Sequence, residues 1–405
     1  MTALRITLVC LLGSLAQLEA HAADTIRIGV IAPLSSPASE DMGKSIVGGA
    51  RVFAQDINAT GGLLGHKVEL LIRDDQAKPE TGVAVARELV EKEKVIAVVG
   101  FANTGVVMQA AKVMQAAKIP LIVSGATGAV IGRTYLPPAV PDSYIFRTSA
   151  SDDLQSPTIL NDAVKRRGFK RIALLHDDSP YGQSGRDSVQ KELAKYQLEP
   201  AMVGAFKVGA GNDTEDLVSK LKASNAQAVI LYGLAADAGE IVQRMDKQGI
   251  QLPVLGPWTL SQRSFLTKAG RSANGARAAV TFVENDLSST KGQFALSYRR
   301  LNETEHIPSA VAAAQTYDAL RLLSLAISQA ISTDGNKVRQ ALENLQYPTT
   351  STVTARYSRP FTPNDHEAIS QDMVVMTEIR NGKLEYAYKE DAANANLLRT
   401  KTGGR

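Results

Sequence analysis

The amino-acid sequence predicts an α/β fold of two Rossmann-like lobes, each with a parallel β-sheet covered by helices. From Thr25 onward, short runs of β-branched and apolar residues alternate with longer amphipathic stretches, a rhythm typical of β-α-β units. The alternation fills two successive stretches of about 120 residues each, which is an ordinary size for a domain. The 405 residues of the chain are enough to give both lobes a buried core.

The first stretch opens with a buried strand at 26–31, which Pro33 ends. A helix at 43–58 follows, with apolar side chains on one face, and Gly61-Gly62 stops it. The same reasoning predicts helices at 79–92 and 104–117 and strands at 68–72, 95–99 and 120–123.

The second stretch repeats the pattern and the C-terminal part then departs from it. We expect strands at 171–175, 202–206, 228–232 and 253–255, separated by helices at 153–167, 182–196, 212–223 and 236–248. Two helical patterns come next, at 309–331 and 335–346, and then strands near 352–357, 372–379 and 384–388. The polar tail, 390–405, has the composition of a disordered segment.

Residues 1–22 have the features of a cleaved secretory signal peptide. Arg5 supplies a positive charge, an apolar run from Ile6 to Leu18 follows, and Ala20 and Ala22 occupy the positions that a signal peptidase reads. The run is too short for a permanent membrane anchor. Cys10 is the chain's one cysteine and lies in this segment; a lipid anchor there is disfavoured, because the preceding Val9 is not small. We therefore expect a soluble, periplasmic mature chain without disulfides.

Residues that could perform catalysis are scarce. The net charge of +4 is thinly spread, which gives no signal for nucleic-acid binding. Met42-Gly43-Lys44-Ser45 resembles the end of a phosphate-binding loop, but Ala38 stands where the motif needs a glycine. The histidines have no metal-ligand spacing. We therefore expect no enzyme activity, no catalytic residues, no cofactor and no metal.

Two strand-to-helix loops are better candidates for a site. Gly100-Phe101-Ala102-Asn103-Thr104-Gly105 follows one predicted strand, and Ser124-Gly125-Ala126-Thr127-Gly128 follows the next. Ligands of open α/β sheets bind at the carboxyl ends of strands, and helix N-termini attract anions. Either loop alone is more often a plain helix cap. Two loops on neighbouring strands together favour a carboxylate site.

The chain resembles the branched-chain amino-acid type of periplasmic substrate-binding protein, the type I binding component of ABC transporters. The resemblance covers nearly the whole mature chain. It is carried by 28–35 (Ile-Gly-Val-Ile-Ala-Pro-Leu-Ser), 48–51 (Gly-Gly-Ala-Arg), 56–62 (Asp-Ile-Asn-Ala-Thr-Gly-Gly), 74–75, 99–100, 124–127, 146–148 (Phe-Arg-Thr), 177–178, 181–182 and 365–366.

The resemblance implies two lobes joined by three crossing strands that close on a ligand by a hinge motion. The crossings would fall near 147–150, 279–283 and 350–356. Lobe 1 would comprise 25–147 and 283–351, and lobe 2 would comprise 148–282 and 352–389. The partners implied are a small carboxylate and an inner-membrane ABC permease, with the protein itself a monomer and no nucleic acid bound. A ligand-sensing regulator or receptor partner on the same fold is the alternative.

The resemblance also implies the site residues. Thr104, Gly125, Ala126 and Thr127 of the first lobe would hold the ligand carboxylate, and Asn103 would be a further ligand-binding residue of that lobe. The second lobe would add Tyr181, Ala235 and Trp258, and Met42 would supply an apolar contact from the first lobe.

One position departs from the family's pattern. Amino-acid binders have an acidic residue after Gly256-Pro257, but this chain has Trp258. A buried ammonium without a partner charge costs several kcal/mol. We therefore expect a carboxylate ligand without a conventional α-ammonium, such as an aromatic or extended apolar acid. If the ligand is an amino acid after all, Glu284 or Asp237 would have to replace the missing acid.

Overall fold

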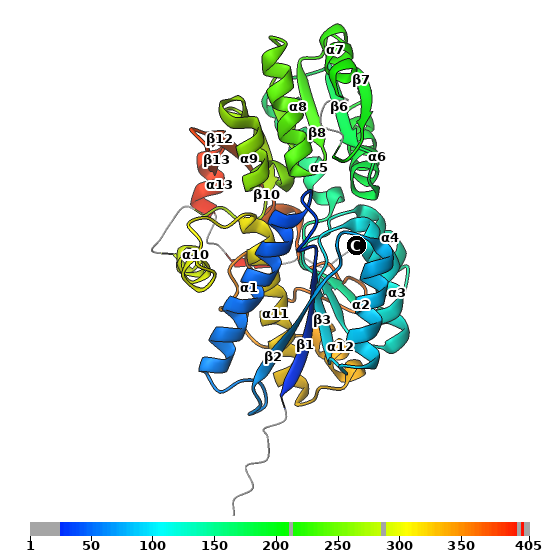
Figure 1. Ribbon diagram of the computed structural model, residues 1–405, viewed down its shortest axis with the longest axis vertical. Coiled ribbons are helices and arrows are strands. Elements are labelled where there is room, and N and C mark those ends of the chain that lie inside the picture. The colour runs from blue at the N-terminus through cyan, green and yellow to red at the C-terminus, as the bar shows by residue number, and fades with distance from the viewer. Residues whose placement is uncertain (1–24, 210–213, 285–288, 395–397, 401–405) are drawn as a thin grey trace, which may run out of the picture.

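The computed structural model describes residues 25–209, 214–284, 289–394 and 398–400. The predicted signal peptide, residues 1–22, lies outside these residues. The described chain forms two α/β lobes stacked along the long axis of the molecule (Figure 1). Lobe 1 is defined here by a five-stranded sheet and lobe 2 by a seven-stranded sheet, each with the helices packed on it.

The sheet of lobe 1 is parallel and has the order β2-β1-β3-β4-β5. Its strands are β1 (Ile26–Ala32), β2 (Val68–Asp74), β3 (Ala97–Gly100), β4 (Leu121–Val123) and β5 (Ile145–Arg147). Helices cover both faces, and so the central strands are apolar on both sides. The helices are α1 (Glu40–Ala59), α2 (Pro79–Glu91), α3 (Thr104–Ala117), α4 (Ala129–Tyr135), α10 (Thr290–Leu301), α11 (Ala310–Ala330) and α12 (Gly335–Glu343).

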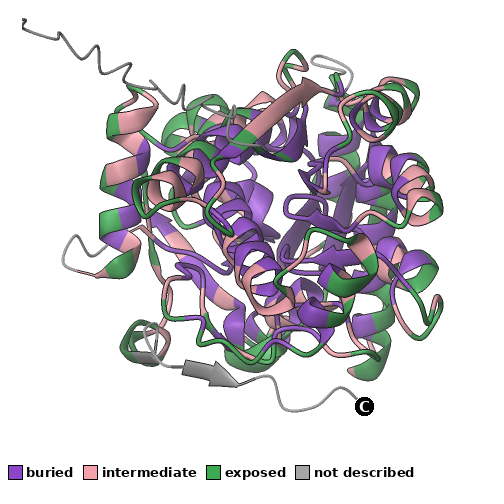
Figure 2. Ribbon diagram, turned by 90° about the horizontal axis from the view of Figure 1, so that it is seen from below, coloured by how far each residue is buried: buried purple, intermediate pink, exposed green. Residues whose placement is uncertain are grey.

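Successive strand residues of lobe 1 enter two different cores. Val30 and Ile122 belong to the core that contains α1 and α11, whereas their neighbours Ile31 and Leu121 belong to the core with α2 and α3. This follows from the two-residue period of a strand. Figure 2 shows the result: buried residues fill the interior, and exposed residues lie on the outer faces of the helices.

The sheet of lobe 2 has the order β13-β12-β10-β9-β8-β6-β7. Its parallel strands are β6 (Ile172–Asp177), β7 (Met202–Phe206), β8 (Ala228–Tyr232), β9 (Val254–Gly256) and β10 (Arg277–Val280). The last two strands, β12 (Val375–Arg380) and β13 (Lys383–Tyr386), are antiparallel. The helices are α5 (Asp152–Leu160), α6 (Pro180–Lys195), α7 (Glu215–Ala223), α8 (Ala235–Lys247) and α9 (Arg263–Ala269).

Three segments connect the lobes, as predicted. The chain leaves lobe 1 after β5 and enters α5, and it returns through 281–284 after β10. The third crossing pairs with the first: Arg147 N donates to His366 O at 2.9 Å, and Ala368 N donates to Arg147 O at 2.8 Å. The crossings are also tied to α11, where the Gln315 side chain donates to Thr281 Oγ1 at 3.0 Å.

The third crossing lies later in the chain than the 350–356 that the sequence suggested. Val353 N and Thr354 N donate to the carboxylate of Asp318 in α11, at 2.6 and 2.9 Å. The ring of Phe361 packs edge-on against Phe146 in β5 at 5.0 Å. Residues 352–366 therefore pack on lobe 1, and their assignment to lobe 2 is corrected.

A disordered segment was expected for 390–405, and the described parts of this tail, 390–394 and 398–400, instead have regular structure. Helix α13 (Lys389–Asn394) is present, and Glu390 pairs with Arg166 at 2.7 Å. Strand β14 (Leu398–Thr400) pairs in parallel with β11 (Arg356–Ser358). Backbone pairing of this kind is not visible in the polar composition on which the expectation rested.

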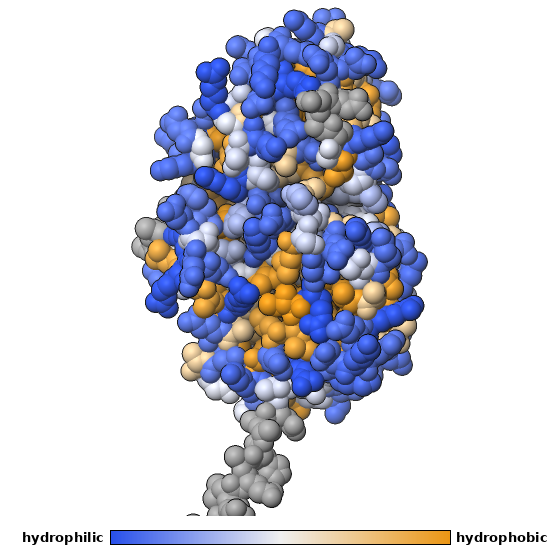
Figure 3. Space-filling view, in the orientation of Figure 1, coloured by the Kyte–Doolittle hydropathy of each residue, from blue (hydrophilic) through white to orange (hydrophobic). Residues whose placement is uncertain are grey.

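No helix among the described residues is long and apolar enough to cross a membrane. Figure 3 shows a mostly hydrophilic face with an apolar area over lobe 1. Strand β2 forms the edge of that lobe's sheet and leaves Leu70, Leu71 and Ile72 half-buried.

The contact between α1 and α11 leads to a stability prediction. A Cβ at Gly49 would lie 2.3 Å from the backbone oxygen of Ala313. Gly49→Ala should therefore push the two helices apart and lower the free energy of unfolding by about 1–3 kcal/mol. This loss should exceed the gain from replacing a helical glycine. Urea unfolding measures the change, and Arg51→Ala, on the exposed side of the same helix, is the control. A stabilised Gly49→Ala variant would contradict the close packing.

Candidate functional site

In lobe 1 the strand order reverses between β1 and β3, and such a switch point is where open α/β sheets bind ligands. The loops that follow these two strands are joined by a hydrogen bond from Asn103 Nδ2 to Ser39 Oγ at 2.9 Å. Met42 lies one turn further along α1 and is buried. The structure thus brings two of the predicted site residues, Asn103 and Met42, to one edge of the sheet.

A backbone turn fixes the two predicted carboxylate loops against each other. Gly100 has a φ of +129°, and a Cβ there would lie 2.2 Å from Ile31 O. Phe101 follows with a φ of +59°, an uncommon conformation for a non-glycine residue that often marks a functional site. This turn directs Phe101 O to accept from Ala126 N at 2.9 Å. A Cβ at Gly125 would lie 2.8 Å from the same oxygen, so the approach requires glycine.

The two threonines occupy different environments. Thr104 Oγ1 accepts from Gly128 N at 3.2 Å, so its hydroxyl holds one loop to the next. Thr127 is 2% exposed and its carbonyl oxygen accepts from Asp152 N at 2.9 Å, across to lobe 2. The Thr127 hydroxyl, by contrast, has no hydrogen-bond partner among the described residues. A buried polar atom of this kind is uncommon and needs an explanation.

Lobe 2 has its own switch point, between β6 and β8. The loops after these strands are joined by a hydrogen bond from Leu234 N to Asp177 Oδ2 at 2.9 Å. Ala235 begins α8 at this place and is buried. Tyr181, in the first turn of α6, is also buried, and its ring centroid lies 5.6 Å from that of Tyr232 at the end of β8. Both switch points therefore carry predicted site residues.

Trp258 is buried in lobe 2 beside α5, the helix that follows the first crossing. It is 3% exposed, and its backbone N donates to the side-chain oxygen of Gln155 in α5 at 3.0 Å. Its indole Nε1 has no partner among the described residues, and the same holds for the hydroxyl of Ser156, next to Gln155. Trp258 thus offers a hydrogen-bond donor as well as an aromatic surface.

The sequence did not single out Asp152, which the structure places among these residues. It is the first residue of α5, fully buried, with Thr127 on one side and Tyr232 on the other. An aspartate after a serine reads as an ordinary helix start, and so nothing local marks it. Its position just beyond the first crossing strand was the available signal.

Burial raises the pKa of the Asp152 carboxyl from its usual 3.8 to about 7. Thr127, Arg147 and Tyr232 oppose the shift without reversing it. The Thr127 hydroxyl is near enough to lower this pKa but does not complete a hydrogen bond. The pKa values of the Tyr181 and Tyr232 hydroxyls are also raised by burial, with Asp152 adding to both effects.

The raised pKa of Asp152 has a consequence for stability. Between pH 3.8 and about 7, the folded chain holds this proton more tightly than the unfolded chain. Stability should therefore fall as pH rises through that window, by up to about 1.4 kcal/mol per pH unit for this group, and level off above it. Asp152→Asn should reduce this dependence of stability on pH. Urea unfolding from pH 4.5 to 7.5 measures it, with the exposed Asp187→Asn as control. Identical slopes in wild type and Asp152→Asn would contradict this assignment.

The lobes contact each other on both sides of these residues. On one side, Ala129 N at the start of α4 donates to Ser184 Oγ in α6 at 2.9 Å. On the other, Ser264 N in α9 donates to Asp41 Oδ2 in α1 at 2.6 Å, and Arg263 N donates to Pro308 O at 2.8 Å. The structure thus has the two lobes held together around the candidate site.

The two acids considered as replacements for the missing carboxylate have partners elsewhere. Glu284 pairs with Arg299 in α10. Asp237 accepts from Gly209 N at 3.1 Å, in the loop after β7. Neither is bonded to a predicted site residue.

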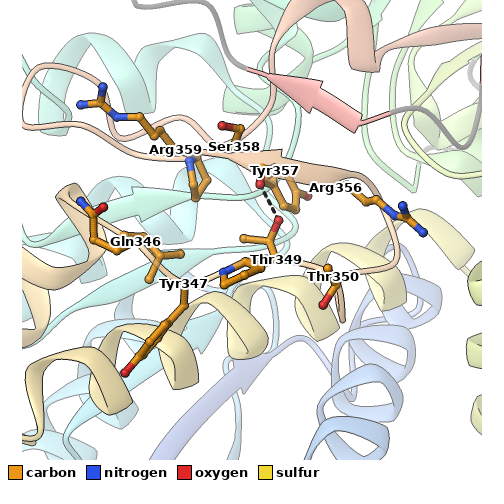
Figure 4. A pocket seen from close by; sticks show the side chains of 11 residues that line it. Gln346, Tyr347, Thr349, Thr350, Arg356, Tyr357, Ser358 and Arg359 are labelled. Carbon is orange, nitrogen blue, oxygen red and sulfur yellow. Dashed lines mark hydrogen bonds between the residues drawn. The ribbon is translucent and has the colours of Figure 1, made fainter.

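A pocket of about 600 Å³ lies elsewhere, between the end of α12 and β11. Figure 4 shows Arg356 and Arg359 extending from its edge in different directions, and the Thr349 hydroxyl bonded to the carbonyl of Tyr357. None of the predicted site residues lines it. Its charged side chains do not converge, so it is a poor candidate for the carboxylate site.

Together, the two switch points and the crossing strands define a two-lobed α/β binding protein of type I. The chain belongs to the periplasmic binding protein family, whose sequence profile matches residues 25–383. This is a family of binding proteins rather than enzymes, and the predicted relationship to Leu/Ile/Val-binding proteins is confirmed.

Individual relatives and solved structures agree with this placement. The Leu/Ile/Val-binding protein homolog 3 of Brucella melitensis is 28% identical over 334 residues, which are 82% of this chain and 87% of the relative. A periplasmic binding protein type 1 from Bordetella pertussis has a TM-score of 0.79 at 23% identity, covering 90% of this chain and 100% of that one. A solute-binding protein of Rhodopseudomonas palustris in complex with 3,4-dihydroxybenzoic acid has a TM-score of 0.74 at 21% identity, covering 89% and 95%.

Proposed function

We propose that this protein is the periplasmic binding component of an ABC importer and captures a small carboxylate between its lobes. The observation that carries the proposal is a set of buried polar atoms near the first crossing that have no hydrogen-bond partner in the described part of the chain: Thr127 Oγ1, Asp152 Oδ2, Ser156 Oγ and Trp258 Nε1. Leaving one such atom unsatisfied costs about 1–3 kcal/mol. A polar ligand bound there would satisfy several of them at once.

We propose that the carboxylate binds to lobe 1, at the start of α3 and the loop after β4. The first amides of a helix are unbonded within it and carry partial positive charge, which favours an anion. Thr104 and Thr127 add hydroxyl groups from neighbouring loops. Lobe 2 supplies Tyr181, Ala235 and Trp258, and contacts from both lobes exist together only when the lobes are closed. Ligand binding therefore shifts the population toward closure.

For the rest of the ligand we propose an aromatic or apolar group instead of a conventional α-ammonium. Trp258 stands where an acid would pair with the ammonium, and neither Glu284 nor Asp237 is bonded to the site residues. The relatives' names point to both classes: one is named for leucine, isoleucine and valine, and another was solved with 3,4-dihydroxybenzoic acid.

A thermal-shift screen tests this function. The ligands are leucine, valine, benzoate, 4-hydroxybenzoate and phenylpropenoate, with benzamide as a control that lacks the carboxylate. A ligand at 100 times its dissociation constant adds about 2.7 kcal/mol of stability, so binding is readily detected. We expect the aromatic acids to raise Tm more than the amino acids and benzamide to leave it unchanged. A larger shift with leucine or valine would overturn the ligand class, and a shift with benzamide would overturn the carboxylate site.

A further inference from the structure

The carboxyl group of Asp152 has one oxygen that the protein does not use. The residue is 0% exposed. Its Oδ1 accepts from the Tyr232 hydroxyl at 3.2 Å, whereas Oδ2 has no hydrogen-bond partner among the described residues. Buried carboxylates are normally paired or fully hydrogen-bonded. The Thr127 hydroxyl lies near enough to lower the pKa of this carboxyl group, but neither it nor another described residue completes a hydrogen bond to Oδ2. A donor on a bound ligand would complete it.

Capping of α5 does not explain the residue. The cap is supplied by Ser151, whose hydroxyl accepts from Asp153 N at 3.3 Å. The backbone oxygen of Ser151 also accepts from Leu154 N at 2.9 Å and Gln155 N at 3.1 Å. The Asp152 side chain instead accepts a hydrogen bond from the Tyr232 hydroxyl.

A buried cation does not explain it either. The positive charge of Arg147, which is itself fully buried, lowers the pKa of Asp152 without forming an ion pair with it. Its guanidinium is bonded to the Glu367 carboxylate and, at 2.9 Å, to Gly128 O. No ion pair joins Asp152 to a basic side chain within the described part of the chain.

Asp152 is surrounded by the residues that we propose to bind the ligand. Its backbone N bonds Thr127 O of lobe 1. Three residues further along the same helix, Gln155 holds the backbone of Trp258. Tyr181 lies beyond Tyr232, ring against ring. Asp152 thus stands between the proposed carboxylate loop of lobe 1 and the aromatic residues of lobe 2.

We infer that Asp152 is a specificity-determining residue, whose free oxygen accepts a hydrogen bond from a hydroxyl or ammonium group of the bound acid. This inference rests on the proposed function. It assigns the ligand to carboxylic acids that carry a hydrogen-bond donor, and it places the acceptor on the first helix of lobe 2 instead of after Gly256-Pro257. Without a donor between them, a ligand carboxylate at Thr127 and the Asp152 carboxylate would repel each other.

Matched pairs of acids test the assignment by calorimetry. Leucine is paired with 4-methylpentanoate, which lacks only the ammonium, and 3,4-dihydroxybenzoate with benzoate, which lacks the hydroxyls. For wild type we expect the donor-bearing member of at least one pair to bind about tenfold or more tightly than its partner. Asp152→Ala should remove that preference. It should weaken the binding of the donor-bearing acid by at least about tenfold and change the affinity for the plain acid by less than about twofold.

Two further variants separate specificity from folding. Asp152→Asn keeps the shape of the side chain and an acceptor oxygen, so it should weaken the binding of leucine strongly and the binding of 3,4-dihydroxybenzoate less. If Asp152→Ala does not fold, the affinities of Asp152→Asn still test the inference. Asp153→Asn is the matched control, since that carboxylate accepts from Ser188 at 2.9 Å. Its preference should equal that of wild type.

The outcomes distinguish this inference from the proposed function. If the Asp152 variants lose the same affinity for both members of a pair, the specificity role is overturned. Asp152 would then have a structural role, or its proton would be shared with the ligand carboxylate. Unchanged preferences would overturn the specificity role as well. In either case carboxylate binding by wild type would leave the proposed function intact. Failure of wild type to bind any of the acids would overturn both.

Discussion

Replacing Arg147 by methionine should lower the free energy of unfolding by about 3–5 kcal/mol, because the fully buried partner of a largely buried ion pair is removed. Arg147 is fully buried in the first crossing strand, and its Nε donates to Glu367 Oε2, in the third crossing, at 2.8 Å. Its Nη1 also donates to Gly128 O, in the loop next to Thr127. The substitution would leave the Gly128 carbonyl without this buried donor and Glu367 without this cation.

A double-mutant cycle isolates this pair. Arg147→Met and Glu367→Leu are combined and each is measured by urea unfolding. Since replacing a whole buried pair is much less costly than breaking it, the double variant should be more stable than Arg147→Met alone. Arg27→Met, which breaks a half-exposed pair with Glu69 at 3.3 Å, should cost less than about 1 kcal/mol. Additive changes in the free energy of unfolding within the cycle would contradict a stabilising role of the Arg147–Glu367 pair. Equal losses for Arg147→Met and Arg27→Met would contradict it as well.

Replacing Thr127 by alanine should weaken ligand binding at least about tenfold while leaving stability unchanged or slightly higher. The Thr127 hydroxyl is buried without a protein partner, so its removal costs the folded chain no hydrogen bond. Thr104→Ala should weaken binding to a similar extent but also lower stability by about 1 kcal/mol, because Gly128 N loses its acceptor.

Calorimetry with the acid that binds most tightly in the thermal-shift screen gives the affinities, and urea unfolding gives the stabilities. Thr60→Ala, at the exposed end of α1, is the control and should preserve the affinity. Unchanged affinity in both site variants would remove the carboxylate site from these loops. A large stability loss in Thr127→Ala would show that its hydroxyl has a structural role.

Much of the fold was predictable because the strands of both sheets are short, apolar and separated by helices of regular period. The helix predicted at 104–117 coincides with α3, and the strand predicted at 228–232 coincides with β8. The loops around Thr104 and Thr127 were predictable for a related reason: the carboxyl ends of parallel strands meet at one edge. The Phe101–Ala126 and Thr104–Gly128 hydrogen bonds show these loops meeting.

The third crossing and Asp152 depend on partners that local patterns do not reveal. The β-branched run at 352–354 reads as a strand, but its amides donate to Asp318, which is over thirty positions away in sequence. The third crossing at 366–368 carries the buried His366 and the half-buried Glu367. These two residues bond Ile145, Glu343 and Arg147, which lie far from them in sequence. Asp152 likewise reads as a helix start until Thr127 and Tyr232 are placed beside it.

The contacts between α9 and α1 and between α6 and α4 contain no atom of the proposed binding set. They contribute to the closed arrangement whether or not a ligand is present, so they help set how often the empty protein closes. The apparent dissociation constant is the intrinsic one divided by the fraction of molecules competent to bind. Affinity in this protein can therefore be changed by residues that do not contact the ligand. Loosening the Ser264–Asp41 contact would change the affinity and the rate at which a ligand dissociates, without changing which ligand is preferred.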